Sequence, residues 1–158
     1  MYIFQKAYKK VKEKDGTLTA VLLLPSPPNE YRRFKEIVKE VIMQLNEERE
    51  SNPWRLKILS RDTSERSPES NYSDIYNADV IIAECSEKKP NIFYMLGLAH
   101  ATGVPVCSCY RIAEKGDEID IPFNVHGRQS LTYIVSDIQS QYLLNQHLKE
   151  WIIKNEKN

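Results

Sequence analysis

The chain has 158 residues, of which 41% are apolar and 28% charged, and its 22 basic residues balance its 22 acidic residues. This composition predicts one globular domain and excludes a disordered or fibrous chain. Without excess positive charge a nucleic-acid partner is not expected, because phosphate neutralisation drives that binding. No apolar run has the length of a membrane span, and the first residues lack a signal-peptide core. We therefore expect a cytoplasmic protein with no membrane partner.

The first elements follow a lysine-rich segment, residues 1–17, which we expect to be an N-terminal arm. The apolar run at residues 19–24 then predicts a strand buried on both faces, because it is short and ends at turn residues. Apolar residues recur at offsets of three, four and seven over residues 31–47, which predicts an amphipathic helix. Ser26 or Asn29 is expected to cap this helix.

The middle of the chain alternates strands and helices. Residues 54–60 predict a strand, residues 61–71 a polar loop and residues 72–77 a short helix. A third strand is expected at residues 80–83. A helix over residues 90–102 follows, ended by a glycine and a proline.

The last part of the chain predicts two further strands, at residues 104–110 and 131–135, and a closing helix over residues 137–154. Ile138 and Tyr142 are expected on the inward face of that helix.

This alternation predicts an α/β fold, a flavodoxin-like three-layer sandwich in which residues 18–158 form one domain around a mostly parallel five-stranded sheet. Ligands of open parallel sheets bind beyond the carboxyl ends of the strands, where the strand order reverses. That rule nominates four segments as the ligand crevice: residues 25–29, 61–71, 84–91 and 110–128.

Three cysteines, Cys85, Cys107 and Cys109, lie in or beside apolar strands. Their odd number and their placement predict buried thiols and no disulfide framework. The Cys-x-Cys pair has too few neighbouring ligands for a structural metal site. We therefore expect neither a metal nor a cofactor.

Residues 78–106 read ADVIIAECSEKKPNIFYMLGLAHATGVPV. This predicts a buried strand with Glu84 at its tip, a polar loop, and a helix that opens at Pro90 and Asn91. Gly97 is expected to let the helix approach the sheet closely. The helix N-terminus is expected to offer free N–H groups to an anion or a hydroxyl.

This stretch resembles the signature of the nucleoside 2-deoxyribosyltransferase-like and bacterial TIR-like superfamily, ADxIIADxT followed by NPNVFYELGxAHAxGKP. Residues 121–128, IPFNVHGR, are similar to the family's IPFDxR stretch. The resemblance covers about residues 18–150. It implies the same flavodoxin-like fold and a family that cleaves or transfers N-glycosidic bonds of nucleosides, nucleotides or NAD.

Met95 stands at the position of the family's motif glutamate, which acts as nucleophile or stabilises the oxocarbenium-like transition state. A thioether has no charge and no proton to exchange, so it can do neither. Three interpretations follow: a natural loss that leaves a binding-only domain, chemistry moved to Glu84 or Glu87, or an engineered substitution.

The strand-end rule and the resemblance together nominate ligand-binding residues at Pro25, Ser26, Asp62, Ser64, Glu84, Ser86, Asn91, Tyr94, Asn124 and Arg128. Glu84 would accept hydrogen bonds from ribose hydroxyls, or else be a solvated strand end. Arg128 would hold a phosphate through its planar fork, or else be a surface arginine.

The other candidates have structural alternatives as well. Ser86 and Asn91 could cap the helix instead, and Tyr94 could pack in the core. Asp62 and Ser64 could lie in a mobile solvated loop.

The leading hypothesis is thus a nucleoside- or nucleotide-binding domain of this superfamily that is degenerate at Met95. Its partner would be a nucleoside, a nucleotide or an NAD-like small molecule. An active N-glycosidase or deoxyribosyltransferase with a displaced acid such as Glu84 is the second hypothesis. The third is an interaction module with a vestigial crevice, and a homodimer is compatible with each of the three.

Overall fold

The computed structural model of the chain describes residues 16–60, 68–122 and 129–156. Five parallel strands form one sheet in the order β2-β1-β3-β4-β5. The strands are β1 (Leu18–Leu23), β2 (Trp54–Leu59), β3 (Val80–Glu84), β4 (Val106–Arg111) and β5 (Ser130–Tyr133). The helical elements are η1 (Pro28–Tyr31), α2 (Arg32–Glu47), α3 (Pro68–Asn77), α4 (Pro90–Thr102) and α5 (Ile138–Asn155).

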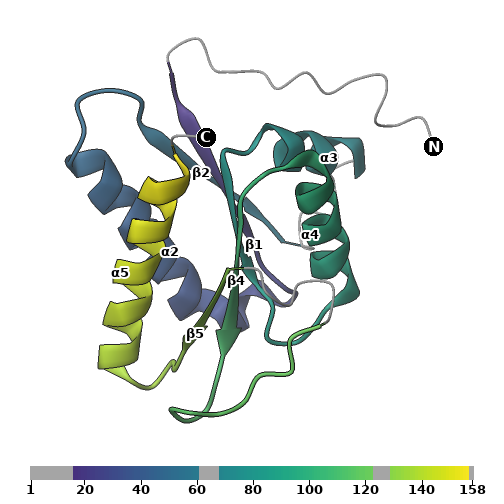
Figure 1. Cartoon of the computed structure of the whole chain (residues 1–158), viewed down its shortest axis with the longest axis vertical. Coiled ribbons are helices and arrows are strands. Elements are labelled where there is room, and N and C mark those ends of the chain that lie inside the picture. The colour runs from purple at the N-terminus through teal and green to yellow at the C-terminus, as the bar shows by residue number, and fades with distance from the viewer. Residues whose placement is uncertain (1–15, 61–67, 123–128, 157–158) are drawn as a thin grey trace.

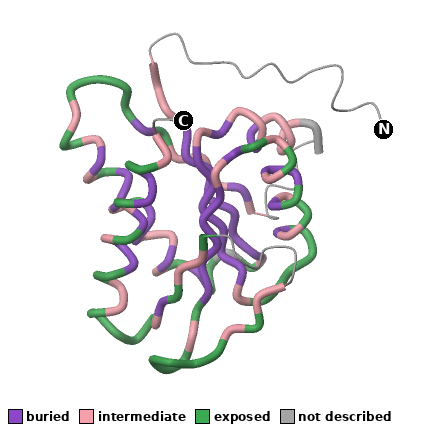
Figure 2. Tube along the Cα trace, in the orientation of Figure 1, coloured by how far each residue is buried: buried purple, intermediate pink, exposed green. Residues whose placement is uncertain are grey.

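The helices cover both faces of the sheet, with α2 and α5 on one side and α3 and α4 on the other (Figure 1). Side chains alternate across a strand, so each strand supplies both faces. Leu22 and Ile82 join the apolar cluster under α2 and α5, whereas Val21 and Ile81 join the cluster under α3 and α4. The central strands β1, β3 and β4 are the most deeply buried of the described residues, whereas β2 and β5 are partly exposed (Figure 2). This architecture confirms the predicted flavodoxin-like three-layer fold.

The central strands β1 and β3 lie side by side, with Leu22 paired to Ile82. All five residues of β3 are buried. Both strands read as nearly continuous apolar runs because helices cover both of their faces. The sequence pattern therefore located them to within about a residue.

Two predictions about helix starts were wrong. Helix α3 begins at Pro68, inside the segment expected to be a loop, because a proline suits the first helical position whatever the apolar pattern. Neither Ser26 nor Asn29 caps α2, since the chain enters it through η1 and no side chain caps either start. Asp137 does cap α5, accepting a hydrogen bond from the Gln139 N–H at 2.9 Å.

The face of helix α5 that is buried differs from the predicted one. The side chains of Ile138 and Tyr142 are 82% and 60% exposed, so the expectation that they face inward was wrong. The buried stripe runs through Leu144, Leu148 and Ile152, and the two exposed residues lie about 70° or more from its centre at 100° per residue.

Gly97 does not bring α4 close to the sheet. The residue is exposed, and a Cβ atom placed there would meet no atom within 4 Å. Gly103 at the end of α4 has φ of +76°, the left-handed geometry that favours glycine, as its predicted place at the end of the helix requires.

The expected arm at residues 1–17 falls almost wholly outside the described residues, and the single-domain expectation for residues 18–158 stays a prediction. Within the described part of the chain, no helix is both long enough and apolar enough to span a bilayer.

Candidate functional site

The candidate site lies at the carboxyl edge of the sheet, where strand order reverses between β1 and β3. The chain leaves β1 toward η1 and α2 on one face, and leaves β3 toward α4 on the other. The two connections diverge at this point (Figure 1). Side chains from the ends of β3, β4 and β5 and from η1 meet here.

Glu84 ends β3 and has no exposed surface. By strand alternation it faces α2 and α5, like Val80 and Ile82. Its carboxylate accepts hydrogen bonds from the Ser86 N–H at 3.2 Å, from the Ser86 hydroxyl and from the Tyr133 hydroxyl at 3.1 Å. The interpretation of Glu84 as a solvated strand end is therefore wrong.

Burial raises the pKa of Glu84 above its usual range, because the charged form loses its hydration. The hydrogen bonds from Ser86 and Tyr133 and the positive charge of Arg111 oppose this rise without cancelling it. Burial and the nearby Glu84 charge also raise the pKa of Tyr133, so the phenol keeps its proton and donates. A buried carboxyl with a raised pKa at the switch point of a parallel sheet is a candidate for a functional group.

The positively charged side chain of Arg111 lies near this carboxyl. The guanidinium of Arg111, an exposed residue at the end of β4, sits 5.3 Å from the centre of the buried Tyr31 ring. The Tyr31 hydroxyl donates to Glu87, which also pairs with Lys89 at 2.9 Å. The Arg111 backbone N–H donates to the Ser86 hydroxyl oxygen at 2.7 Å. That hydroxyl therefore joins the ends of β3 and β4.

Tyr31, Arg111 and Tyr133 were missed as site residues from the sequence. The two tyrosines belong to apolar patterns that predicted core positions, and both are in fact buried. Arg111 lies just beyond the strand predicted at residues 104–110, whereas it is the last residue of β4. A signal was available in the end-of-strand rule, which nominated residues 110–128.

Met95 lies on the opposite face of the sheet from Glu84. It is partly buried and packs against the apolar cluster under α3 and α4, together with Ile119 and Ile121. The structure therefore does not bring the Glu84 carboxyl to the face that Met95 occupies. Glu87 lies in the loop before α4 and turns toward Tyr31.

The start of α4 is capped by neither of the predicted residues. Lys89 is the N-cap, and no side chain bonds to that turn, so neither Ser86 nor Asn91 caps it. The N–H groups of Ile92 and Phe93 donate to the Lys89 carbonyl oxygen at 3.0 and 3.3 Å. These two donors already have a partner within the turn.

Tyr94 does not pack in the core, contrary to that interpretation, because its side chain is 64% exposed. Its hydroxyl oxygen lies 3.3 Å from that of Tyr72, and the two rings are tilted by 52° with their centres 6.3 Å apart. This pair joins the surfaces of α3 and α4, away from Glu84.

Pro25 is buried and Ser26 partly buried in the turn after β1, at the same edge as Glu84. The Ser26–Pro27 peptide bond is cis. The remaining sequence-predicted site residues lie outside the described part of the chain: Asp62, Ser64, Asn124 and Arg128.

The three cysteines are buried and unpaired, as predicted. Burial raises the pKa of Cys85 to about 12, so its thiol stays protonated. Among the described residues, no group of three or more histidine, cysteine, aspartate or glutamate side chains is arranged to hold a metal ion.

Comparison with known proteins gives one informative result. No family model matches the chain, and no curated protein matches its sequence. Among solved structures, the CMP N-glycosidase BcmB of Clostridium botulinum resembles it with a TM-score of 0.50 and 18% identity, over 82% of this chain and 98% of that one. At this identity the likeness shows a shared fold and no more.

Proposed function

We propose that the chain binds a nucleoside or nucleotide at the carboxyl edge of its sheet and leaves the N-glycosidic bond intact. The observation that carries this proposal is the Glu84 carboxylate, buried at the switch point and held by two hydroxyl groups and one N–H. Its place at the switch point of a parallel sheet suits a ligand site. The shared fold with a CMP N-glycosidase supports a nucleotide as the ligand class.

The partners of Glu84 indicate the chemistry that it would accept from a ligand. Ser86 and Tyr133 present hydroxyls to it, as a ribose diol would. A ribose hydroxyl that replaced one of these hydroxyls would donate the same kind of hydrogen bond, so the number of hydrogen bonds that the carboxylate accepts would stay the same. Because Glu84 has no exposed surface, such binding must displace side chains that enclose it.

Met95 is the reason for proposing binding without cleavage. The sequence resemblance puts it where the superfamily has its glutamate, and it packs among apolar side chains. A thioether there offers no charge to a developing oxocarbenium ion. Glu84 faces the other side of the sheet, away from the position of Met95.

Isothermal titration tests the binding, with the four ribonucleoside 5′-monophosphates and their nucleosides added to the wild type and to Glu84→Gln. We expect saturable binding by the wild type for at least one ligand and weaker binding by Glu84→Gln, which keeps an acceptor but loses the charge. Glu50→Gln is the matched control, because Glu50 is exposed beyond the far end of α2. No heat from any ligand at millimolar concentration would refute the proposal.

A second candidate function is cleavage by Glu84 itself, favoured by the raised pKa of this carboxyl, which suits a general acid. Chromatography for free base or nicotinamide, over a panel of nucleosides, nucleotides and NAD, separates the two candidates. Turnover by the wild type that Glu84→Gln abolishes would establish the second.

A further inference from the structure

Arg111 is a cation beside the candidate site whose side-chain donors meet no acceptor among the described residues. Its guanidinium stacks on Tyr31 and makes no hydrogen bond or ion pair with any other residue that the structure describes. Other arginines differ in this respect. Arg33 pairs with Glu36 and Glu40 on α2, and Arg49 pairs with Glu156 at the end of α5. Arg111 lies against an aromatic ring, and within the described part of the chain no acceptor meets its five side-chain N–H donors.

The two carboxylates near Arg111 are already occupied. Glu84 accepts from Ser86 and Tyr133, and Glu87 accepts from Tyr31 and pairs with Lys89. The guanidinium therefore lies beside two acidic side chains without forming the bidentate pair that an arginine and a carboxylate usually form.

Strand pairing between β3 and β4 sets the position of Arg111 relative to Glu84, and the Ser86 hydroxyl adds a further link. The Ser86 hydroxyl donates to Glu84 and accepts from the Arg111 backbone N–H. A ligand whose hydroxyl reaches Glu84 therefore brings its neighbouring groups to the end of β4. In a nucleotide, the 5′-phosphate is attached to the same ribose as the hydroxyls.

We propose that the Arg111 guanidinium is the phosphate subsite, so that the ligand class is a nucleoside phosphate and not an unphosphorylated nucleoside. This inference rests on the proposed function and deepens it. The planar fork of arginine matches two phosphate oxygens, and a charge-assisted contact of this kind contributes about tenfold or more to affinity. Stacking on Tyr31 limits the motion that the side chain loses when it binds.

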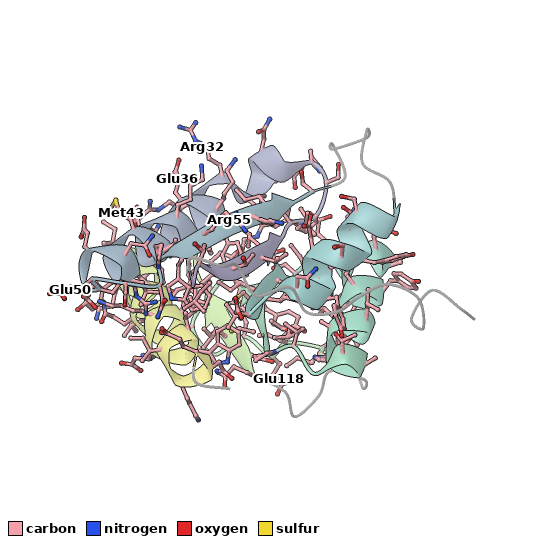
Figure 3. The ribbon with its side chains drawn as sticks, turned by 90° about the horizontal axis from the view of Figure 1, so that it is seen from above. Arg32, Glu36, Met43, Glu50, Arg55 and Glu118 are labelled. Atoms are coloured by element: carbon pink, nitrogen blue, oxygen red, sulfur yellow. The ribbon has the colours of Figure 1, made fainter. Side chains whose placement is uncertain are left out.

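Matched variants provide the test. Arg111→Gln removes the charge and the fork, whereas Arg111→Lys keeps the charge alone. Arg32→Gln is the control, because Arg32 opens α2 and its 80% exposed side chain pairs only with the neighbouring Glu36 at 3.1 Å. Figure 3 shows both side chains on the outer surface of that helix. Each protein is titrated with the four ribonucleoside 5′-monophosphates, the four nucleosides and inorganic phosphate.

For the base that binds, we expect the wild type to take the monophosphate about tenfold more tightly than the nucleoside. Arg111→Gln should remove that difference, Arg111→Lys should restore part of it, and Arg32→Gln should keep it in 0.15 M salt. Inorganic phosphate should compete with the monophosphate and not with the nucleoside. Thermal unfolding of each variant checks that the protein is folded.

Three results would overturn the inference. If the monophosphate and the nucleoside bind equally, or Arg111→Gln weakens both alike, Arg111 is not the phosphate subsite and the proposed function still stands. If inorganic phosphate alone binds as tightly as the monophosphate, the subsite belongs to free phosphate. If no nucleoside and no monophosphate binds, the proposed function fails together with the inference.

Discussion

Replacing Tyr133 by phenylalanine removes one hydroxyl from the site and leaves the surrounding packing in place. The ring of Tyr133 stacks on Phe34 with centres 5.1 Å apart and planes 21° apart, and a phenylalanine ring keeps that contact. The lost group is the donor that reaches the Glu84 carboxylate at 3.1 Å. The change therefore isolates one hydrogen bond to a buried acid.

The magnitude follows from the charge of the acceptor. A hydrogen bond to a charged group stabilises a fold by about 1.5–3 kcal/mol, against about 0.5–1.5 kcal/mol for a neutral pair. At 3.1 Å this bond is longer than the usual O–H···O distance, so we expect a loss of about 1.5–2 kcal/mol at neutral pH. For a chain of this length that corresponds to a fall in Tm of about 3–8 °C.

The loss should depend on pH with a defined sign. The pKa of Glu84 is raised in the fold, so its stabilising contribution is fully present below the usual carboxyl value and is lost as pH rises through the folded pKa. Tyr133 opposes that rise, so Tyr133→Phe raises the folded pKa further. The difference in the free energy of unfolding between wild type and variant should therefore increase from pH 4 to pH 8.

Urea denaturation at several pH values measures this difference, because the midpoint and slope give the free energy of unfolding at each pH. Tyr94→Phe is the control: Tyr94 is an exposed tyrosine on α4, away from Glu84, and its variant should stay within about 0.5 kcal/mol of the wild type. A Tyr133→Phe loss that is the same at pH 4 and pH 8, or no larger than that of the control, would refute the assignment of Tyr133 as a donor to a charged Glu84.

Three further changes have expected outcomes. Met95→Glu should lose about 1–3 kcal/mol of stability, because it puts a carboxyl among apolar side chains; a variant as stable as the wild type in urea denaturation would contradict that packing. Native thiol titration should label the three buried cysteines slowly, and rapid labelling of all three would contradict their burial. In sedimentation the wild type should be a homodimer and Ile138→Asp a monomer, since Ile138 and Tyr142 expose apolar surface on α5; a monomeric wild type would contradict this.

The sequence predicted the strands and the long helices well because their apolar patterns record burial directly. β1 and β3 lie between helices on both faces, so nearly every residue is apolar, and the α2 stripe has the helical period. The errors arose where burial was not the controlling factor. α3 starts at Pro68 among polar residues, and Ile138 is apolar but exposed.

The site was harder to predict because its residues come from four elements far apart in the chain. The end-of-strand rule found Glu84 and the edge, but it gave no information about which side chains converge on that carboxyl. Tyr31 and Tyr133 combine a buried ring with a hydroxyl in use, and an apolar pattern records only the ring. Glu84 and Met95 lie on opposite faces of the sheet, because Glu84 points toward α2 and α5 while α4, which carries Met95, packs on the other face. The face on which α4 packs is known only from the three-dimensional structure.

Equilibrium dialysis against a nucleoside 5′-monophosphate, with chromatography of the ligand recovered from both chambers, tests the central claim most directly. We predict saturable retention of the ligand by the wild type, weaker retention by Glu84→Gln, and recovery of the whole ligand with its glycosidic bond intact. Free base in the wild-type chamber would contradict binding without cleavage. Equal ligand in both chambers for all four monophosphates would contradict a nucleotide site at this edge of the sheet.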